Sequence, residues 1–485
     1  MTDVRILALR RKLHENAELS MHEQKTQQIL KDFLQENTDL QIIEQPGFFC
    51  GLRKAEKARR GPIALRADID ALPALNGAAH YCGHDGHSAI LANVAMLESG
   101  CQRDRDVYFL FQPGEETGQG ARICEKFLEE NGVEEIYGLH NIPGFPLNQI
   151  LLKNGTFACG SVGLAITFKG AVSHAAYPEA GKNPAGALAA LVLGIERLIE
   201  RQRKDDILMA TVIGIDAGSD NYGISAGEGT LRLTVRAEKQ EQLTALLKEI
   251  RQLVKLLAEK YGLEYHVEEK DYFPATENHI ENVEKLRIIA HNLQLSVTDL
   301  SEPMHWSEDF GNYLVKFNGA FFGVGAGEDH PQLHTSDYQF PDEIIDTASA
   351  MLRGLLEDEP LEVVAGLIWK DDRFLIAQRP ADKARGNMWE FVGGKKEAGE
   401  SYQQALKREL QEELGIEVAV GDLAVDTIYS YPDLDVHLNL FNCQIIAGQP
   451  RLLEHQDLRW ISRQETADYQ FCPADRQLLQ LLFKD

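Results

Sequence analysis

Three glutamates in the last third of the chain have a spacing that suits a metal site. Glu409, Glu412 and Glu413 lie at i, i+3 and i+4 of a helix predicted over about 401–414, so their side chains project from neighbouring parts of one face. Crowded carboxylates repel one another unless a cation lies among them, and hard oxygen ligands suit Mg²⁺ or Mn²⁺. Such an ion could neutralise a pyrophosphate and activate a water molecule.

The surrounding residues distinguish a metal site from an ordinary acidic helix face. Residues 394–416 fit the pattern G-x5-E-x7-R-E-U-x-E-E-x-G-U, in which U is a bulky apolar residue, at every fixed position. Leu406, Leu410 and Leu414 form a core-facing stripe, and Gly415 is well placed to end the helix. A solvated acidic face is the usual explanation of a lone Glu-Glu pair, but a match at this many positions favours the metal site.

A second group of candidate metal ligands lies in the first third of the chain. Cys82 and His84 are two residues apart on a predicted turn, a spacing that lets both reach one metal ion. Taken alone, the pair could equally be a buried thiol beside unrelated histidines. The seven cysteines are odd in number and irregularly spaced, which indicates reduced thiols and not a disulfide framework.

Further candidate ligands follow apolar segments with the pattern of strands. Glu115 and Glu116 end one such segment, His140 ends another, and His334 comes late in the chain. In open α/β sheets, sites form at the carboxyl ends of strands. One Cys, three His and one Glu would make a two-metal centre suited to Zn²⁺, Mn²⁺, Co²⁺ or Ni²⁺. The second carboxylate would be free to act as a base.

The elements that must position these side chains form three pieces, one of them split. Residues 1–156 and 274–357 combine helices with short apolar strands, which predicts an α/β domain with a mostly parallel sheet. The clearest strands are 62–66 and 107–112, and the opening, 6–35, has helical periodicity.

The other two pieces are an insertion and a C-terminal domain. In residues 157–273 the predicted order is βαββαβ, as in a ferredoxin-like domain. Its elements are a strand at 162–168, a helix at 183–203, strands at 207–215 and 229–236, a helix at 238–261 and a strand at 263–269. An acidic break at 357–360 precedes the last piece, 361–485, which opens with strands at 361–369 and 374–377.

The net charge of −26 argues against binding to nucleic-acid polymers, which require a basic surface. Small anionic substrates remain compatible with it, because a bound divalent cation can invert the local field. The chain starts without a signal-peptide pattern and has no apolar stretch of membrane-spanning length. We therefore expect a cytoplasmic protein without membrane partners.

Residues 361–485 resemble the Nudix hydrolases, and within them the MutT-like group that hydrolyses oxidised or non-standard nucleoside triphosphates. Besides the glutamate motif, the resemblance rests on four stretches: Gln378-Arg-Pro, Trp389-Glu-Phe-Val-Gly-Gly, Glu454-His-Gln before Trp460, and Phe471-Cys-Pro-Ala-Asp. It implies an α/β/α sandwich, with Mg²⁺ or Mn²⁺ held by Glu409, Glu412 and Glu413.

The same resemblance implies roles for further residues. Arg408 would orient a glutamate, and Glu454 would be a further metal ligand or the general base. Arg379 and Asp475 would contact the nucleotide, although an Asp before a helix could otherwise be only an N-cap. MutT itself has Asn at the position of Asp475, and Val392 replaces a usual Pro, so the base preference stays open.

Residues 1–355 resemble the aminoacylase/carboxypeptidase-type metallopeptidases, in the branch of hippurate hydrolase and indoleacetyl-amino-acid hydrolases. The motifs that carry this resemblance are Arg10-Arg-Lys-Leu-His-Glu-Asn-Ala-Glu-Leu-Ser, Leu65-Arg-Ala-Asp-Ile-Asp-Ala-Leu-Pro, Cys82-Gly-His-Asp and Ser307-Glu-Asp-Phe-Gly. The ligands it implies are Cys82, His84, Glu116, His140 and His334.

This resemblance also implies a base, supporting residues and an oligomer. Glu115 would be the general base, and Asp70 would support the metal ligands from behind. The insertion would be a lid through which two copies dimerise. His174 could reach across the dimer to stabilise an oxyanion, although an isolated histidine would more often be structural. Asn221 and Arg236 would contact the substrate carboxylate.

The chain departs from this family around the substrate pocket. The spacer 74–81 is shorter than usual, Glu179 and Asn183 replace the usual His and Asp, and Tyr222-Gly-Ile-Ser follows Asn221. The predicted metal chemistry is intact while the pocket diverges.

The sequence thus predicts a bifunctional enzyme that hydrolyses N-acyl amino acids and nucleoside triphosphates. Two alternatives stay open. The chain could be a dipeptidase, or one half could be active while the other serves as a nucleotide-sensing or dimerisation module.

Overall fold

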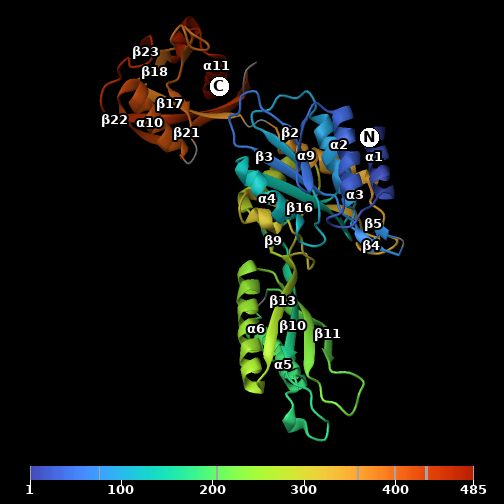
Figure 1. Cartoon of the computed structure of the whole chain (residues 1–485). Helices are drawn as coiled ribbons and strands as arrows, with labels where there is room; N and C mark the ends of the chain where they lie inside the picture. Colours follow the sequence, from blue (N-terminus) through green and yellow to red (C-terminus); the bar gives the residue numbers. More distant parts are fainter. Residues whose placement is uncertain are drawn as a thin grey trace. The chain divides into compact units, whose positions relative to one another are not determined.

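The computed structural model describes residues 2–75, 77–203, 206–357, 360–397, 400–431 and 435–483 (Figure 1). The chain divides into two compact units, Met1–Glu357 and Asp358–Asp485. Two residues of the predicted acidic break, 358 and 359, lie outside the described residues. Among the described residues, none of the helices combines the length and the apolar character needed to span a bilayer.

An eight-stranded sheet forms the centre of the first unit. In spatial order its strands are β1 (Gln41–Gln45), β2 (Phe48–Arg53), β6 (Val107–Gln112), β3 (Ile63–Asp68), β7 (Glu135–Pro143), β16 (Asn318–Gly327), β8 (Ile150–Leu152) and β15 (Val297–Asp299). The central strands from β6 to β16 run parallel, whereas β1, β2 and β8 pair antiparallel with their inner neighbours. The predicted α/β class is confirmed, with a mixed sheet that is parallel at its centre.

Helices cover both faces of this sheet. One face packs against α1 (Val4–Glu15), α2 (Gln24–Asn37), α3 (His84–Leu97), α7 (Ile280–Asn292) and α9 (Ile345–Gly354), and the other against α4 (Gly120–Glu130) and α8 (Gly311–Leu314). Successive side chains of a strand point to opposite faces of the sheet. In β3, Ile63 and Leu65 therefore pack against the first group of helices, and Ala64 packs against the second group.

The segment with helical periodicity, 6–35, forms two helices. Helix α1 ends at Glu15 and α2 begins at Gln24, so a turn at residues 16–23 separates them. The turn between them reaches the metal-ligand region, where the Ser20 hydroxyl donates a hydrogen bond to Asp70 at 2.7 Å. A tertiary contact therefore overrides the local helical pattern.

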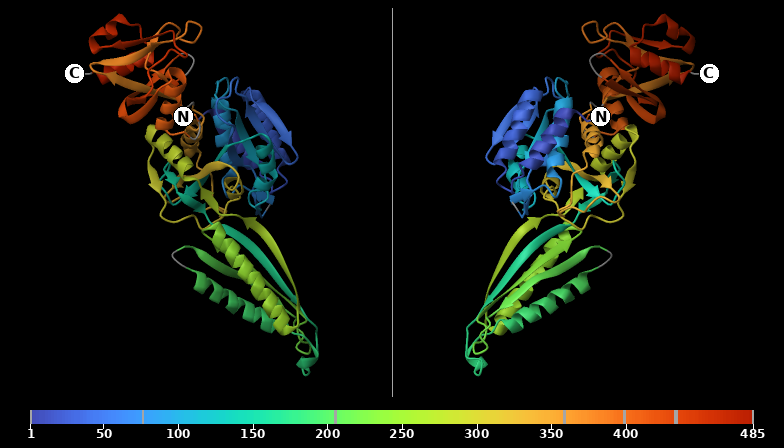
Figure 2. Two further views of the ribbon diagram at one scale, coloured as in Figure 1. Left: turned by 90° about the vertical axis from the view of Figure 1, so that its left-hand side faces the viewer. Right: turned by 90° about the vertical axis from the view of Figure 1, so that its right-hand side faces the viewer.

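The inserted domain, called the lid from here on, has the predicted βαββαβ order. Its elements are β10 (Gly160–Lys169), α5 (Ala185–Gln202), β11 (Leu208–Ala217), β12 (Glu228–Ala237), α6 (Gln240–Tyr261) and β13 (Glu264–Phe273). The sheet is antiparallel in the order β11-β12-β10-β13. Both helices pack on one face of it (Figure 2).

The second unit is an α/β/α sandwich, as predicted. Its strands are β17 (Leu361–Lys370), β18 (Arg373–Gln378), β19 (Trp389–Glu390), β20 (Gly393–Lys395), β21 (Glu417–Ser430), β22 (Asp435–Ala447) and β23 (Asp457–Ile461). Helix α10 (Tyr402–Leu414) packs on one face with Val364 and Ile368, and α11 (Pro473–Leu482) packs on the other with Ala365 and Leu367.

Helix α10 is delimited by strong local signals. Ser401 and Gln404 form a reciprocal capping box at its start, and Gly415 ends it in the left-handed conformation, with φ of 66°. These contacts satisfy backbone groups that a bare helix end leaves unpaired. They fix the rotation of the helix, and with it the direction of the three glutamates.

We predict that Ser401→Ala lowers the free energy of unfolding of the second unit by about 1 kcal/mol, because the N-cap hydrogen bond is lost. Ser401→Thr keeps the hydroxyl and should retain most of that stability. Urea unfolding followed by tryptophan fluorescence measures both. Equal midpoints for the Ala and Thr variants would show that the cap does not stabilise α10.

Candidate active sites

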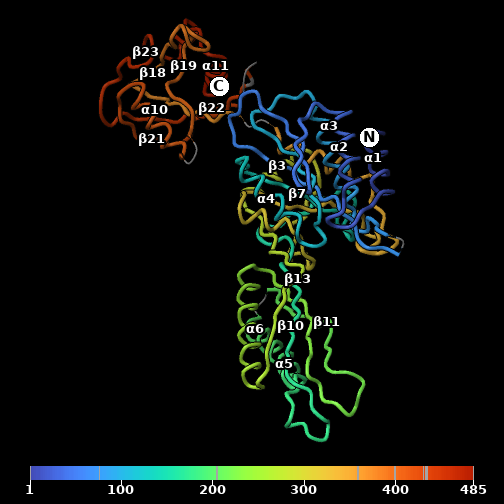
Figure 3. The backbone as a smooth tube through the Cα atoms, viewed as in Figure 1, coloured from blue at the N-terminus to red at the C-terminus, as the bar shows by residue number. Residues whose placement is uncertain are grey.

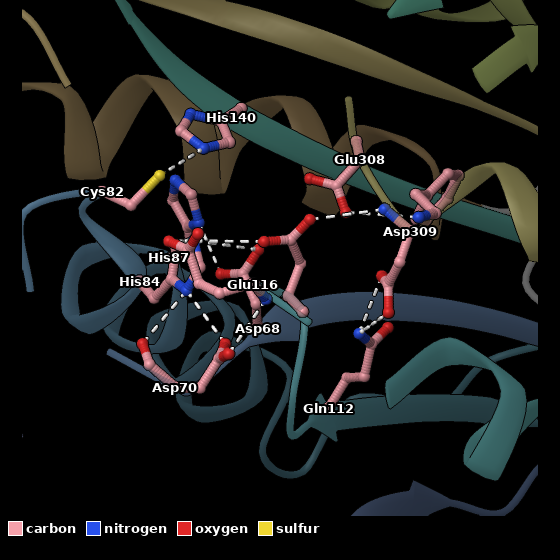
Figure 4. Close-up of polar contacts among 12 residues, drawn as sticks. Asp68, Asp70, Cys82, His84, His87, Gln112, Glu116, His140, Glu308 and Asp309 are labelled. Carbon is pink, nitrogen blue, oxygen red and sulfur yellow. Dashed lines mark hydrogen bonds and ion pairs between the residues drawn. The ribbon is translucent and has the colours of Figure 1, made fainter. Parts of the chain in front are cut away.

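The predicted metal ligands of the first unit converge at the carboxyl ends of the central strands, and Figure 4 shows four of them, Cys82, His84, Glu116 and His140. Cys82 and His84 lie at the start of α3, Glu116 follows β6, His140 lies in β7, and His334 lies beyond β16. Gly83 separates the first two in a left-handed conformation with φ of 93°. This turn aims both neighbouring side chains at one point.

The contacts among these side chains are close. Cys82 Sγ lies 3.4 Å from His140 Nε2 and 3.2 Å from His334 Nε2. Glu116 Oε1 lies 3.7 Å from His334 Nε2 and 3.9 Å from His84 Nε2. All five predicted ligands therefore share one cluster, four of them buried or nearly so, with His334 at its exposed rim.

Hydrogen bonds behind the cluster fix which nitrogen of each histidine faces it. His84 Nδ1 lies 3.1 Å from Asp70 Oδ1, and His140 Nδ1 lies 2.8 Å from the carbonyl oxygen of Asn141. Nδ1–H therefore donates outward and Nε2 points inward, the arrangement usual for metal-binding histidines. His84 Nε2 and Glu116 Oε1 are buried without a hydrogen-bond partner. These two atoms face each other at 3.9 Å and both carry a lone pair, so a divalent cation could bind between them.

Glu115 lies beside this cluster, as predicted for a general base. Its Oε2 is 4.0 Å from His84 Nε2, and its Oε1 accepts a hydrogen bond from the backbone N–H of Asp309 at 3.3 Å. Burial raises the pKa of Glu115 well above its usual range, and the neighbouring Glu308 and Glu116 raise it further. Burial also raises the pKa of Glu116, to about 7. Cations in the cluster would offset both effects.

Sequence reasoning missed a buried network that supports the cluster. The Arg66 guanidinium is fully buried and donates to Asp68 at 2.7 Å and to Glu308 and Asp309 at 2.9 Å each. Asp68 also lies 2.6 Å from His87 Nδ1. Asp68, Glu308 and Asp309 all fall inside the family motifs, which was the available signal, but nothing local linked segments more than 200 residues apart.

The lid residues divide between its two ends. Arg236 lies at the end near the catalytic sheet, where its Nη1 donates to the carbonyl oxygen of His305 at 2.6 Å and to Ser307 Oγ at 2.8 Å. The loops that follow β10 and β11, residues 170–184 and 218–227, lie at the opposite end (Figure 3), and they contain the exposed His174 and Asn221. The ten-residue strand β10 that separates the ends spans roughly 30 Å. One chain therefore does not bring His174 or Asn221 to Glu115.

In the second unit, Arg408 organises the acidic side chains of α10. Its guanidinium donates to both carboxylate oxygens of Glu400, at 2.8 and 3.0 Å, and to Glu409 at 2.7 Å. Arg408 Nη1 also donates to Glu412 Oε2, at 3.3 Å. Residues 398 and 399 of the glycine loop lie outside the described residues.

The remaining candidates of the second unit differ in burial. Glu413 is largely buried, burial raises its pKa to about 7, and its Oε2 has no hydrogen-bond partner. Glu454 is half-exposed and pairs with Lys383 at 3.0 Å. Arg379 forms an ion pair with Glu390.

Asp475 is buried within the first turn of α11, and its Oδ1 accepts the backbone N–H of Phe391 at 2.8 Å. Burial raises its pKa to about 8. The N-cap of α11 is Cys472, so the interpretation of Asp475 as an N-cap is wrong. The side chain is instead tied to the loop after β19, beside Arg379 and Glu390.

Comparison with known proteins identifies both halves. The model of peptidase family M20/M25/M40 matches residues 64–358, more than half of the chain. The chain belongs to this family. A NUDIX domain model matches residues 363–481. The chain is therefore a hydrolase with an M20 amidohydrolase domain followed by a Nudix domain.

Curated relatives match the M20 part along nearly their whole length. N-acetylcysteine deacetylase of Bacillus subtilis (strain 168) is 29% identical, over 71% of this chain and 94% of its own. N-acetyldiaminopimelate deacetylase of Lactobacillus helveticus is 27% identical, with the same shares covered.

A solved structure adds evidence on the metal centre. The Bacillus subtilis YXEP protein, described as a dinuclear metal binding peptidase from the M20 family, is 26% identical with a TM-score of 0.62. The match covers 73% of this chain and 96% of that one. That protein is thus a dinuclear metal-binding member of the same family.

Gly83 gives a direct test of the cluster geometry. A Cβ at this position would lie 2.6 Å from Asn141 Oδ1 and 2.8 Å from the Tyr338 hydroxyl oxygen. We predict that Gly83→Ala displaces Cys82 and lowers the zinc bound per chain, measured by mass spectrometry after dialysis.

Gly132→Ala is the matched control, because Gly132 also has a positive φ, 65°, but open space around it. It should cost only about 1 kcal/mol of left-handed strain and leave the metal content unchanged. Unchanged metal in Gly83→Ala would show that the turn does not set the cluster.

Proposed function

We propose that this protein is a bifunctional hydrolase whose M20 domain cleaves the amide bond of N-acyl amino acids. The observation that carries the proposal is the convergence of the orphaned His84 Nε2 and Glu116 Oε1 beside the buried Glu115. The deacetylase activities in the names of the relatives support an acyl amino acid as the substrate.

The residues of the cluster suit this reaction. Cys82, His84, Glu116, His140 and His334 would hold two divalent cations, of Mn²⁺, Zn²⁺, Co²⁺ or Ni²⁺, with Asp70 orienting His84. Cations bound there would polarise the scissile carbonyl group and acidify a water molecule. Glu115 would take a proton from the attacking water and return it to the leaving amine nitrogen.

The lid supports a homodimer as the active form. His174 and Asn221 lie at the end of the lid away from their own cluster, so a second copy would supply them for oxyanion and carboxylate binding. Exposed apolar side chains accompany them, including Tyr222, which is 99% exposed, and Ile213 on the edge strand β11, which is 64% exposed. Arg236 would bind the substrate carboxylate beside Ser307.

The Nudix domain would hydrolyse nucleoside triphosphates, including modified ones. Glu409, Glu412 and Glu413 would hold Mg²⁺ or Mn²⁺, with Arg408 orienting the first two. Glu454 would be a further ligand or the general base once it leaves Lys383. Arg379 and Asp475 would contact the nucleotide, since both lie beside the loop after β19.

We predict that the full-length, metal-reconstituted chain releases amino acids from a panel of N-acyl amino acids and phosphate products from nucleoside triphosphates. Cys82→Ser should lose the first activity by at least about a hundredfold and keep the second, because it removes one metal ligand. Glu412→Gln should do the reverse.

Each variant is the control for the other. Equal loss of both activities in either variant would contradict two independent sites. Release from dipeptides but from no N-acyl amino acid would indicate a dipeptidase. Nucleotide binding without hydrolysis would indicate a sensing module.

Subunit mixing tests whether His174 acts across a dimer. His174→Ala and Cys82→Ser should each be inactive in deacylation, but a mixture refolded together should recover about a quarter of the activity through random pairing. In mixed dimers one site receives all its residues. No recovery, although mixed dimers are isolated by differential tags, would show that His174 does not act across the dimer.

A further inference from the structure

Two neighbouring residues of the Nudix domain, Glu454 and His455, have opposite environments. Glu454 is half-exposed and paired with the flexible Lys383 side chain, whereas the His455 side chain is only 5% exposed. Both precede β23, where the backbone N–H of Gln456 donates to the carbonyl oxygen of Gln378 at 2.9 Å. That strand pairing holds His455 in place, and its side chain points towards the glutamates of α10.

His455 lies between two carboxylates. Its Nε2 is 3.1 Å from Glu390 Oε1 and 3.9 Å from Glu413 Oε2. Glu390 uses its other oxygen for the ion pair with Arg379. Arg379, Glu390, His455 and Glu413 therefore form a continuous polar chain from the proposed nucleotide contact to α10.

Glu413 lacks the support that the other two glutamates receive. Arg408 binds Glu409 and Glu412, but no contact joins it to Glu413. Glu413 Oε2 is buried and has no hydrogen-bond partner among the described residues, and His455 Nε2 lies 3.9 Å from it. The orientation of this carboxylate therefore depends on the imidazole and on whatever ion it binds.

We propose that His455 is a positioning residue that holds Glu413 in the orientation needed to bind a divalent cation. The inference rests on the proposed role of the α10 glutamates as ligands. With Nε2–H donating to Glu390 at 3.1 Å and facing Glu413 at 3.9 Å, one imidazole edge lies between the two carboxylates. Glu390 also pairs with Arg379, so His455 connects the proposed nucleotide contact, Arg379, with helix α10.

The experiment measures Mn²⁺ binding by electron paramagnetic resonance of the free ion. The full-length chain is first loaded with Zn²⁺ and desalted, because the proposed Cys- and His-rich site of the M20 domain should prefer Zn²⁺ to Mn²⁺. Glu409→Gln identifies the part of the titration that belongs to α10.

His455→Asn and His455→Gln form the matched pair. The amide nitrogen of Gln takes the place of Nε2, whereas that of Asn takes the place of Nδ1. We expect His455→Asn to raise the Mn²⁺ dissociation constant by about tenfold or more, the usual effect of removing a residue that supports a ligand. His455→Gln should stay close to the unsubstituted chain.

His437→Asn is the surface control. His437 also lies between two carboxylates of this unit, Glu362 at 2.9 Å and Asp426 at 3.0 Å, but it contacts none of the three α10 glutamates. It should leave the dissociation constant unchanged. Should His455→Asn fail to fold, His455→Leu, which fills the space without a donor, takes its place.

The outcomes separate this inference from the proposed function. Unchanged Mn²⁺ binding in His455→Asn, or equal losses in the Asn and Gln variants, would overturn the positioning role. If the unsubstituted chain binds Mn²⁺ no better than Glu409→Gln, the proposed metal site on α10 itself is wrong.

Discussion

The M20 site depends on holding several carboxylates together in a space that excludes water. Glu115, Glu308, Asp309 and Asp68 are all buried, and like charges repel strongly where the dielectric is low. Arg66 offsets this repulsion from the centre of the sheet, because a single guanidinium reaches three of the four. Breaking such a buried group by removing one partner typically costs about 3–5 kcal/mol. The position of Glu115, the proposed general base, therefore depends on a fully buried arginine.

In the Nudix domain an arginine likewise offsets the repulsion among neighbouring carboxylates. Arg408 makes a two-pronged contact with Glu400 and extends to Glu409 and Glu412. The fixed planar fork of arginine suits both sites, since lysine offers a single point of charge. In both domains the guanidinium leaves some neighbouring carboxylates uncontacted, and two of these, Glu116 and Glu413, have a buried oxygen without a hydrogen-bond partner.

Much of this was predictable from sequence, for identifiable reasons. Helix α10, the βαββαβ order of the lid and the five-residue cluster around Cys82 all follow from local motifs and from strand ends that share one edge of a sheet. Local signals failed where long-range contacts decide the outcome. The turn at residues 16–23 breaks a helical pattern to reach Asp70, and Arg66 joins segments that no periodicity connects. The sequence drew attention to Glu454, a possible metal ligand or general base, and not to His455. The two neighbours differ in burial, which the sequence does not reveal.

The lid joins the rest of its unit through a narrow crossing. The chain enters at Gly160 and returns after Phe273, and these two stretches are paired, with Ser161 opposite Phe273. A Cβ on Gly160 would come within 2.8 Å of the backbone nitrogen of Ala275, so the two backbones nearly touch. Rotating the lid about the direction of these strands would break the hydrogen bonds between β10 and β13, whereas bending the two strands together would keep those bonds. The base of the lid is thus tied to the catalytic domain twice, by the close approach of these two backbones and by the hydrogen bonds from Arg236 to His305 and Ser307.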